Sequence, residues 1–246
     1  MNRQFVEKSN LPNKQVKLCI TAGDKEIYLG QDIAILKTLQ CKDVYEEIEY
    51  HPDIQMCYLG NGRIVICPNM YDKYAKEFEK IGLECIRGRN RLRSSYPYDI
   101  PYNACIIDKY FIHNLEYTDP VLLEEAKKMN LKCINVKQGY TKCNISIVDK
   151  NSIITSDKGI QKELEKYFDV LYINPDENIL LGNMYGFIGG ATGLISNNRW
   201  AINGDIYNLR EYDKVISFLK TRSIEVVCLN REKISDIGTI IPIKYE

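Results

Sequence analysis

Hydrophobic and polar residues follow one another along this chain in a unit that recurs. The stretch DIQMCYLGNGRIVICP, residues 53–68, holds two apolar runs around the polar turn Gly-Asn-Gly, a pattern that predicts a β-hairpin. DIPYNACIIDKYFIHN, residues 99–114, aligns with it without a gap at an offset of 46. A third copy is KCNISIVDKNSIITSD, residues 142–157, in which Asp149-Lys150 matches Asp108-Lys109 at an offset of 41. Self-similarity at such a period predicts a fold built from copies of one unit.

Each hairpin is followed by a helical pattern and then by one more short apolar run. Apolar residues three or four positions apart predict helices in YDKYAKEFEKIG, DPVLLEEAKKMN and DKGIQKELEKYF, because this spacing places them on one helix face. The apolar runs LECI, LKCINV and DVLYI come next and predict strands. The unit is therefore β-β-α-β.

Two further units complete the pattern. GATGLISNNRWAINGD, a helix near LREYDKVISFLKTR and the strand IEVVCL make a fourth unit. In the N-terminal unit we expect strands in KLCITAGDKEIYLG, a helix in residues 31–40 and a strand in residues 43–48, but the first strand is missing. The strand-type run GTIIPIKY near the end of the sequence can supply it and so close the ring without an exposed sheet edge.

The expected fold is therefore α/β: a five-bladed, pseudo-symmetric α/β propeller of ββαβ units, closed by pairing of the C-terminal strand with the N-terminal unit. No segment has the composition of a linker, so we expect a single domain over residues 1–246. The repeat units are expected at about residues 16–47 plus 234–245, 48–88, 97–137, 138–175 and 182–230.

Composition narrows the possible functions. The 246 residues include 33 Lys and Arg against 33 Asp and Glu, so no overall charge attracts nucleic acid or an anionic membrane. No apolar run is long enough to span a bilayer, and residues 1–15 lack the apolar core of a signal peptide. The nine cysteines are scattered singly, which argues against zinc and disulfide frameworks. We expect a cytoplasmic protein that needs no cofactor or metal.

A ring of five ββαβ units at this length resembles the pentein, or guanidino-group-modifying, superfamily. It includes arginine and agmatine deiminases, dimethylarginine dimethylaminohydrolases and amidinotransferases. The motifs HPDI, YPYDIPYNA, GFIGG and DIGTIIP look still closer to an uncharacterised bacterial family described as having that fold. In the enzymes of the superfamily a Cys attacks the guanidinium carbon, a His two blades earlier acts as general acid and base, and acidic side chains hold the guanidinium group.

The resemblance implies roles for individual residues. HPD looks like the H-x-D motif that carries the catalytic His and a substrate-binding Asp, which makes His51 the acid–base residue and Asp53 a substrate ligand. GYTKCNISIV is similar to the glycine-rich approach and nucleophile strand, which makes Cys143 the nucleophile. Asp99 matches Asp53 in the repeat, and Asp236 precedes the closing strand. Converging carboxylates of this kind can hold a guanidinium or amine through charge-assisted hydrogen bonds.

Two features complicate this assignment. Asn103 aligns with Asn144 in the repeat, so Asn103 is a further candidate ligand in the channel, or a residue that fixes a local turn. The enzymes also carry an E-G-G-D-like motif whose second acid supports the catalytic His. In SDIGTII that position is Thr239, which puts catalytic activity in question.

Each candidate also has a structural interpretation. Cysteine is most often a small buried hydrophobe, and Cys143 can be one. The neighbouring Lys142 can lower its pKa, but strand alternation would point Lys142 away from it. His51 can be a hydrogen-bonded structural residue, as we expect for His113, and the Asp residues can cap turns.

Three other sets of residues are assigned to structure. Cysteines in strand-like runs are read as core: Cys19, Cys67, Cys85, Cys133 and Cys228. The glycines of GFIGGATG, residues 186–193, are read as allowing close approach of the blades, since no phosphate-binding pattern surrounds them. The basic run RGRNRLR, residues 87–93, is read as a solvated loop, with a lid over an anionic ligand as the alternative.

Two functions therefore remain open. The first is a hydrolase or amidinotransferase acting on a small guanidine, amidine or amine-bearing metabolite through Cys143 and His51. The second is a catalytically silent protein that binds such a molecule on the same scaffold. The sequence leaves the identity of the ligand and the oligomeric state undetermined.

Overall fold

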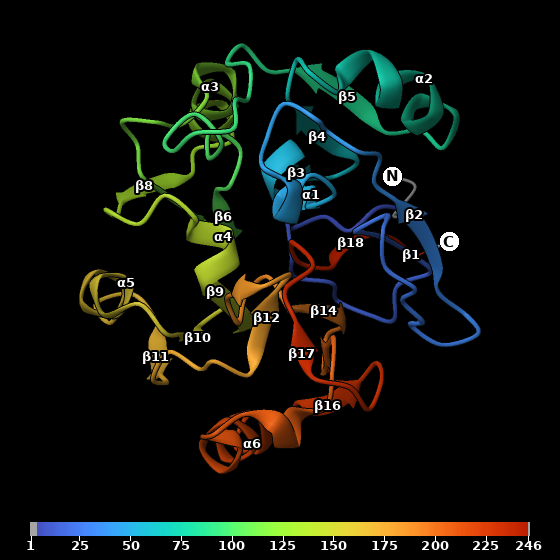
Figure 1. Cartoon of the computed structure of the whole chain (residues 1–246). Coiled ribbons are helices and arrows are strands. Elements are labelled where there is room, and N and C mark those ends of the chain that lie inside the picture. The colour runs from blue at the N-terminus through green and yellow to red at the C-terminus, as the bar shows by residue number, and fades with distance from the viewer. Residues whose placement is uncertain (1–3, 246) are drawn as a thin grey trace.

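Five small sheets repeat one arrangement of strands around a common centre (Figure 1). The computed structural model describes residues 4–245. In each of the five sheets the middle strand pairs antiparallel with one neighbour and parallel with the other. This arrangement confirms the expected five-bladed α/β propeller.

Four blades follow the ββαβ order along the chain, with their helices on the periphery of the ring (Figure 1). The first is β3 (Met56–Gly60), β4 (Arg63–Ile66), α2 (Tyr71–Lys80) and β5 (Glu84–Arg87). The second is β6 (Cys105–Ile107), β7 (Tyr110–His113), α3 (Pro120–Lys128) and β8 (Lys132–Asn135). The third is β9 (Ile145–Asp149), β10 (Ser152–Thr155), α5 (Lys158–Leu164) and β11 (Asp169–Tyr172). The fourth is β14 (Thr192–Ser196), β15 (Arg199–Ile202), η2 (Ile206–Asn208), α6 (Tyr212–Lys220) and β16 (Glu225–Cys228).

The fifth blade joins the two ends of the chain. Strand β18 (Ile241–Lys244) pairs antiparallel with β1 (Leu18–Thr21), which pairs parallel with β2 (Ala34–Lys37). The expected closure by the C-terminal strand is therefore confirmed. Two details of this blade were predicted wrongly: the expected helix in residues 31–40 contains strand β2, and the expected strand in residues 43–48 contains the 3₁₀ turn η1 (Glu46–Ile48). Pairing with β1 overrides the ambiguous local pattern of β2.

A sixth sheet was not predicted. It consists of β12 (Ile179–Leu181), β13 (Met184–Tyr185) and β17 (Ile234–Ser235), with β12 in the middle. Each strand has only two or three residues, too few for a hydrophobic period. The Gly-Asn pair at 182–183 between β12 and β13 is a hairpin signal that could have revealed it.

Two short helices lie near the centre of the ring (Figure 1). Helix α1 (Pro52–Gln55) precedes β3, and α4 (Thr141–Asn144) precedes β9. Pro52 favours this start because its fixed φ suits the first helical turn and its missing N–H leaves no donor unsatisfied. Cys143 was expected at the start of a strand; the structure places it one turn earlier, in α4.

The strand pairing also corrects the repeat alignment. The three hairpins close at the pairs Gly60–Arg63, Ile107–Tyr110 and Asp149–Ser152. Equivalent positions are therefore offset by 47 and 42 residues, one more in each case than the gapless sequence alignment. At the offset of 47 residues, the repeat position of Asp53 falls at Ile100, so Asp99 does not occupy it.

Two apolar clusters fill the space between blades. One surrounds Tyr58 and Phe111 and includes the N-terminal blade, and the other surrounds Trp200 on the opposite side of the ring. Each peripheral helix contributes a narrow apolar stripe, such as Leu122 and Ala126 of α3. This packing holds the inner strand ends in fixed positions around the centre. Within residues 4–245, no helix has the length and apolarity that crossing a membrane requires.

Candidate active site

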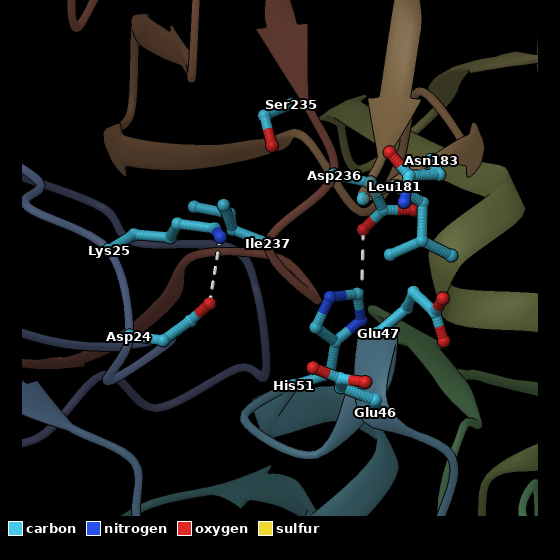
Figure 2. Close-up of a pocket in the computed structure, with 11 residues that line it drawn as sticks. Asp24, Lys25, Glu46, Glu47, His51, Leu181, Asn183, Ser235, Asp236 and Ile237 are labelled. Atoms are coloured by element: carbon cyan, nitrogen blue, oxygen red, sulfur yellow. Dashed lines mark ion pairs between the residues drawn. The ribbon is translucent and has the colours of Figure 1, made fainter.

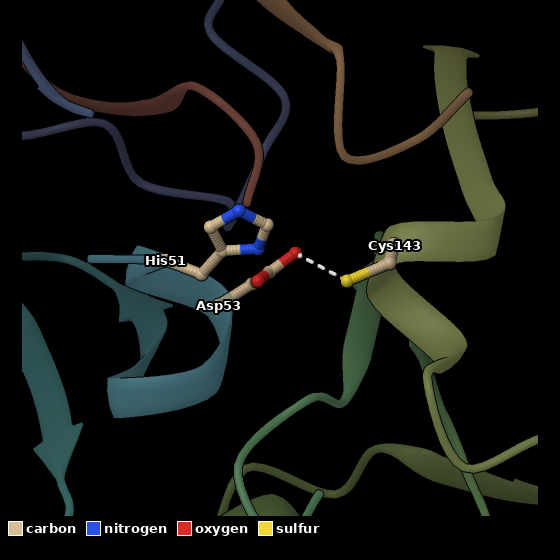
Figure 3. A group of neighbouring side chains, drawn as sticks. All are labelled: His51, Asp53 and Cys143. Carbon is tan, nitrogen blue, oxygen red and sulfur yellow. Dashed lines mark hydrogen bonds between the residues drawn. The ribbon is translucent and has the colours of Figure 1, made fainter. Parts of the chain in front are cut away.

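Helices α1 and α4 bring three reactive side chains together at the ring centre. The Cys143 thiol donates a hydrogen bond to Asp53 Oδ2 over 3.1 Å, and Figure 3 shows both side chains beside the His51 ring. One ligand-type atom from each of the three lies within 4.8 Å of the others. All three residues are at most 4% exposed. The sequence predicted this grouping from motifs 90 residues apart.

Asn103 fixes the two helices against each other. Its amide nitrogen lies 3.1 Å from Cys143 Sγ and 3.2 Å from the carbonyl oxygen of Asp53. Its side-chain oxygen accepts from the backbone N–H groups of Lys142, at 2.8 Å, and Cys143, at 3.3 Å. The side-chain amide of Asn103 therefore contacts both helices.

Asp236, which follows β17, faces the imidazole ring of His51 (Figure 2). Its Oδ1 lies 3.8 Å from His51 Nδ1, and its carboxylate accepts hydrogen bonds from the backbone of Phe187 and Gly238 over 2.9 and 3.0 Å. His51 Nδ1 is buried and has no hydrogen-bond partner among residues 4–245. A carboxylate therefore does stand beside the histidine, although position 239 carries no acid.

The glycine-rich segment GFIGGATG lets backbone approach this carboxylate closely. A Cβ on Gly190 would overlap the Asp236 carboxylate, and one on Gly189 would lie 2.6 Å from the carbonyl oxygen of Cys143. Side chains at these positions would displace Asp236 or α4. The structural reading of these glycines is confirmed.

Lys142 is buried rather than on the surface. Because Cys143 lies in a helical turn, the two adjacent side chains do not alternate between faces, and Lys142 is only 6% exposed. Its ammonium donates to Thr239 Oγ1 over 2.7 Å. Thr239 itself has φ +76°, an unusual value for a β-branched residue. The ammonium group of Lys142 thus contacts position 239, where the enzymes of the resemblance carry the second acid of their E-G-G-D-like motif.

Burial and negative charge keep the Cys143 thiol protonated. The pKa of Cys143 is raised well above its usual value, first by burial and then by the charges of Asp53 and Asp236. Burial also raises the pKa of Asp53, against the opposing effects of the charges on His51 and Lys142. In the ligand-free protein the thiol is therefore a neutral hydrogen-bond donor.

Asp99 lies in a neighbouring polar cluster. It accepts a hydrogen bond from the Tyr140 hydroxyl, and its other carboxylate oxygen has no partner among residues 4–245. Burial raises the pKa of Asp99. The Tyr140 ring packs 6.1 Å from that of Phe187, measured between centroids. Asp99 therefore orients an aromatic residue next to α4 and has no hydrogen bond to Cys143.

His113, Cys57 and Cys105 are buried and have the surroundings of structural residues. His113 Nε2 lies 3.1 Å from the carbonyl oxygen of Gly139, and burial lowers its pKa to about 4, which confirms the prediction for His113. Burial raises the pKa of Cys57 and Cys105 to about 12. Three cysteines read as core are only partly buried: Cys85, Cys133 and Cys228.

The basic run at residues 87–93 is a surface loop. All four of its arginines are exposed. Arg87 pairs with Asp72 over 3.0 Å, and the backbone N–H groups of Arg89 and Asn90 donate to the carboxylate of Asp119. These contacts hold the run against α2 and the start of α3, and the exposed arginines agree with the solvated-loop interpretation.

A cavity of about 240 Å³ leads to the cluster. Figure 2 shows His51 and Asp236 on one side of it, with Glu46 and Glu47 of η1 nearby. The cavity contains no wall residue from α4, so it reaches the three-residue cluster through His51. Its lining residues are Asp24, Lys25, Glu46, Glu47, His51, Leu181, Gly182, Asn183, Ser235, Asp236 and Ile237.

The cluster also has the atoms that a metal ion would need. A histidine nitrogen, a carboxylate oxygen and a thiolate sulfur are ligands of zinc, and the three side chains are close enough to share one ion. Binding would require loss of the thiol proton and of the hydrogen bond from Cys143 to Asp53. The same atoms can instead serve a nucleophile and its acid–base partner.

The fold is similar to solved structures of an amidinotransferase, an agmatine deiminase and DDAH. Inosamine-phosphate amidinotransferase from Streptomyces griseus is 8% identical, with a TM-score of 0.60 over 99% of this chain and 97% of that one. Agmatine deiminase from C. jejuni is 11% identical, with a TM-score of 0.53 over 90% of each chain. DDAH from Pseudomonas aeruginosa, in complex with citrulline, is 9% identical, with a TM-score of 0.53 over 88% of this chain and 92% of that one.

The fold therefore defines a pentein-type protein, structurally related to guanidino-modifying enzymes. The chain belongs to a family of unknown function, DUF6873, whose model matches residues 24–241. No curated protein sequence matches the chain. Identities of about a tenth establish a shared fold and leave the activity to be argued from the site.

Proposed function

We propose that this protein is a cysteine-dependent hydrolase or amidinotransferase acting on a small guanidino or amidino compound. The observation that carries the proposal is the contact of Cys143 with Asp53 beside His51, which itself lines an acidic cavity. A nucleophile, an acid–base residue and a carboxylate for the substrate cation are the groups that this reaction needs.

The reaction proceeds through a covalent intermediate. The Cys143 sulfur attacks the planar carbon of the cationic head, and the thiol proton passes to His51. The bond from this carbon to the leaving nitrogen breaks as His51 protonates that nitrogen, which leaves the amidino group on sulfur. Water or a second amine then attacks the same carbon and gives a proton to His51. The carbon–sulfur bond breaks, the urea or new guanidine leaves, and the proton returns from His51 to sulfur.

The charges of the site favour this chemistry only when a cation is bound. In the free protein, Asp53 and Asp236 raise the pKa of Cys143. A guanidinium between these carboxylates would offset their charge and so lower the pKa of the thiol. Asp53 would hold the cation, Asp236 would orient His51, and Asn103 would keep α4 in register with α1. Asp99 would contribute through Tyr140.

One observation favours the alternative, a silent binding protein. Lys142 is an internal cation near Asp53, and its contact Thr239 stands where the enzymes carry an acid. Such a site could hold a cation without converting it. The nine free cysteines support a reducing compartment, the cytoplasm, for either function.

The proposal is tested by turnover. The protein is incubated with a panel of small guanidines and amidines in the presence of EDTA, and released ammonia or amine is measured. We expect release from the parent, none from Cys143→Ser, and a loss of at least about 100-fold in His51→Ala. Cys133→Ser, a matched change at a half-buried strand position, controls for the substitution itself.

Two results would contradict this mechanism. Release that survives in Cys143→Ser would exclude the cysteine as nucleophile. No release from any compound, together with a compound that raises Tm in both parent and Cys143→Ser, would identify a binding protein. Release that disappears in EDTA would mean that the three side chains serve a metal.

A further inference from the structure

The mouth of the cavity carries more negative charge than a guanidinium head requires. Four of its lining residues are acidic, and apart from His51 the one basic side chain, Lys25, is paired with Asp24 over 2.8 Å. Asp236 lies at the inner end, beside His51. That leaves Glu46 and Glu47 at the entrance without a counter-ion.

Glu46 and Glu47 are held in place but have no partner. Both lie in the 3₁₀ turn η1, and within residues 4–245 neither carboxylate has a side-chain hydrogen bond or ion pair. Gly182 of the β12–β13 turn packs against Glu47, because a Cβ there would lie 2.9 Å from Glu47 Cγ. Figure 2 shows Glu47 next to the His51 ring. Two adjacent uncompensated carboxylates favour a cation.

A second, independent observation points to a ligand in the same cavity. His51 lines it, is 4% exposed, and has a ring nitrogen without a hydrogen-bond partner. A buried polar atom without a partner is costly unless a bound molecule completes it. The cavity, about 240 Å³, is smaller than typical drug-binding pockets, so the molecule is small.

We infer that the ligand carries two positive charges and no carboxylate: a guanidinium or amidinium head toward His51 and Asp236, and an amine tail toward Glu46 and Glu47. The inference rests on the proposed function for the position of the head. An α-amino acid with the same head would bring its carboxylate toward the carboxylates of η1, and like charges at this distance repel. The entrance therefore selects aminoalkylguanidines over guanidino acids.

Agmatine and arginine test the inference, because they differ only by a carboxylate. Their dissociation constants are measured by calorimetry at low salt with Cys143→Ser, which prevents turnover. We expect agmatine to bind at least tenfold more tightly than arginine, with a preference that weakens as salt screens the entrance. In Glu46→Gln/Glu47→Gln the ratio should fall toward one. Glu77→Gln/Glu79→Gln, which removes two exposed carboxylates from α2, should keep the ratio.

Three outcomes would overturn the inference: arginine binding as tightly as agmatine, no binding of either, or an unchanged ratio in Glu46→Gln/Glu47→Gln. Methylguanidine separates this failure from that of the proposed function, because it carries the head without a tail. If methylguanidine binds and agmatine gains nothing over arginine, the head site stands and the tail site is wrong. If agmatine is preferred but the parent converts none of the compounds, the tail site stands and catalysis is wrong.

Discussion

Cys143 and Asp53 share a hydrogen bond in a place almost without solvent. A neutral thiol beside a carboxylate is a weak nucleophile, since only the thiolate reacts. Burial, followed by the charges of Asp53 and Asp236, therefore disfavours the thiolate in the ligand-free protein. In the proposed reaction, a bound cation would offset the charges of these carboxylates.

Removing one of these carboxylates should make Cys143 more acidic. The charge of Asp53 raises the pKa of the thiol and Asp53 also accepts its proton, so Asp53→Asn should shift the pH midpoint of Cys143 alkylation to lower pH. Peptide mass spectrometry after timed alkylation gives this midpoint. Asp149→Asn, at the far end of β9, controls for a lost carboxylate. An unchanged midpoint in Asp53→Asn would show that the two groups are not coupled.

His113 should make the protein sensitive to mild acid. Its pKa is lowered from 6.5 to about 4 in the folded state by burial. Between these pH values His113 is therefore protonated in the unfolded chain and neutral in the folded protein. Stability is therefore unaffected well above pH 6.5 and falls as pH drops from there toward 4. Between pH 7 and pH 5 the loss is about 2 kcal/mol.

Urea unfolding at the two pH values measures this effect. His113→Gln cannot titrate, so the variant should be less stable than the parent at pH 7 but should lose about 2 kcal/mol less on acidification. An equal loss in parent and variant would assign the acid sensitivity to other groups.

The residues of the site differ in how far sequence could predict them. His51, Asp53 and Cys143 carry motif information, and the structure brings them together. The orientation of Lys142 stayed open because it depends on whether residue 143 lies in a strand or in a helical turn. Four residues are too few for periodicity to tell these apart. Glu47 has no motif and is identified only by the cavity that it lines.

At the scale of elements, the short helices α1 and α4 place Asp53 and Cys143 next to each other at the centre of the repeated blades. Each short helix delivers its side chains inward, and the glycine-rich segment before β14 closes over both Asp236 and α4. The site thus combines two blades and the turn that leads into a third. A change in this turn should therefore affect the chemistry and the fold together.

Gly190→Ala tests this turn. Because a Cβ would overlap the Asp236 carboxylate, the variant must displace either the turn or Asp236, and we expect a loss of a few kcal/mol in stability together with weaker agmatine binding. Urea unfolding and calorimetry measure both. Gly159→Ala, within helix α5, should change stability by no more than about 1 kcal/mol. A Gly190→Ala protein with parental stability and binding would show that the turn does not hold Asp236.

The elements that sequence predicted well are those with clear periods. Hairpins with polar turns and amphipathic helices of seven to ten residues were placed in four blades. The errors lie where the pattern is short or mixed: β2 is half-exposed and has both strand-like and helix-like spacing. Acidic residues 46 and 47 disfavour a strand, which could have indicated the 3₁₀ turn.

Over the whole molecule, closure of the ring depends on β18. This strand is fully buried and joins the N-terminal blade through pairing with β1. We predict that Ile243→Ala, at a fully buried position, lowers the free energy of unfolding by about 2–5 kcal/mol. Ile35→Ala on the half-exposed outer strand β2 should cost less. Equal losses in urea unfolding would mean that β18 is no more important to closure than an outer strand.

The net charge of the whole molecule does not reveal the local negative charge of the cavity. Equal numbers of acidic and basic residues predict no long-range attraction for a polyion. The cavity is nevertheless lined mainly by acidic residues, and Lys142, which does not line it, donates to Thr239. This separation appears only after folding, because Asp24, Glu47 and Asp236 come from distant parts of the sequence. The composition could therefore argue against nucleic acid and anionic membranes as partners, but it could not indicate a small cationic ligand.

Trapping the covalent intermediate would test the nucleophilic role of Cys143 most directly. The parent is mixed with agmatine, quenched in acid at short times and digested, and the cysteine peptides are analysed by mass spectrometry, with the other eight cysteines as internal controls. We predict an added amidino group on Cys143 alone, which forms far more slowly in His51→Ala because His51 takes the thiol proton and protonates the leaving nitrogen. An unmodified Cys143 at every time, while agmatine still raises Tm, would contradict a covalent mechanism and identify the ring as a binding scaffold.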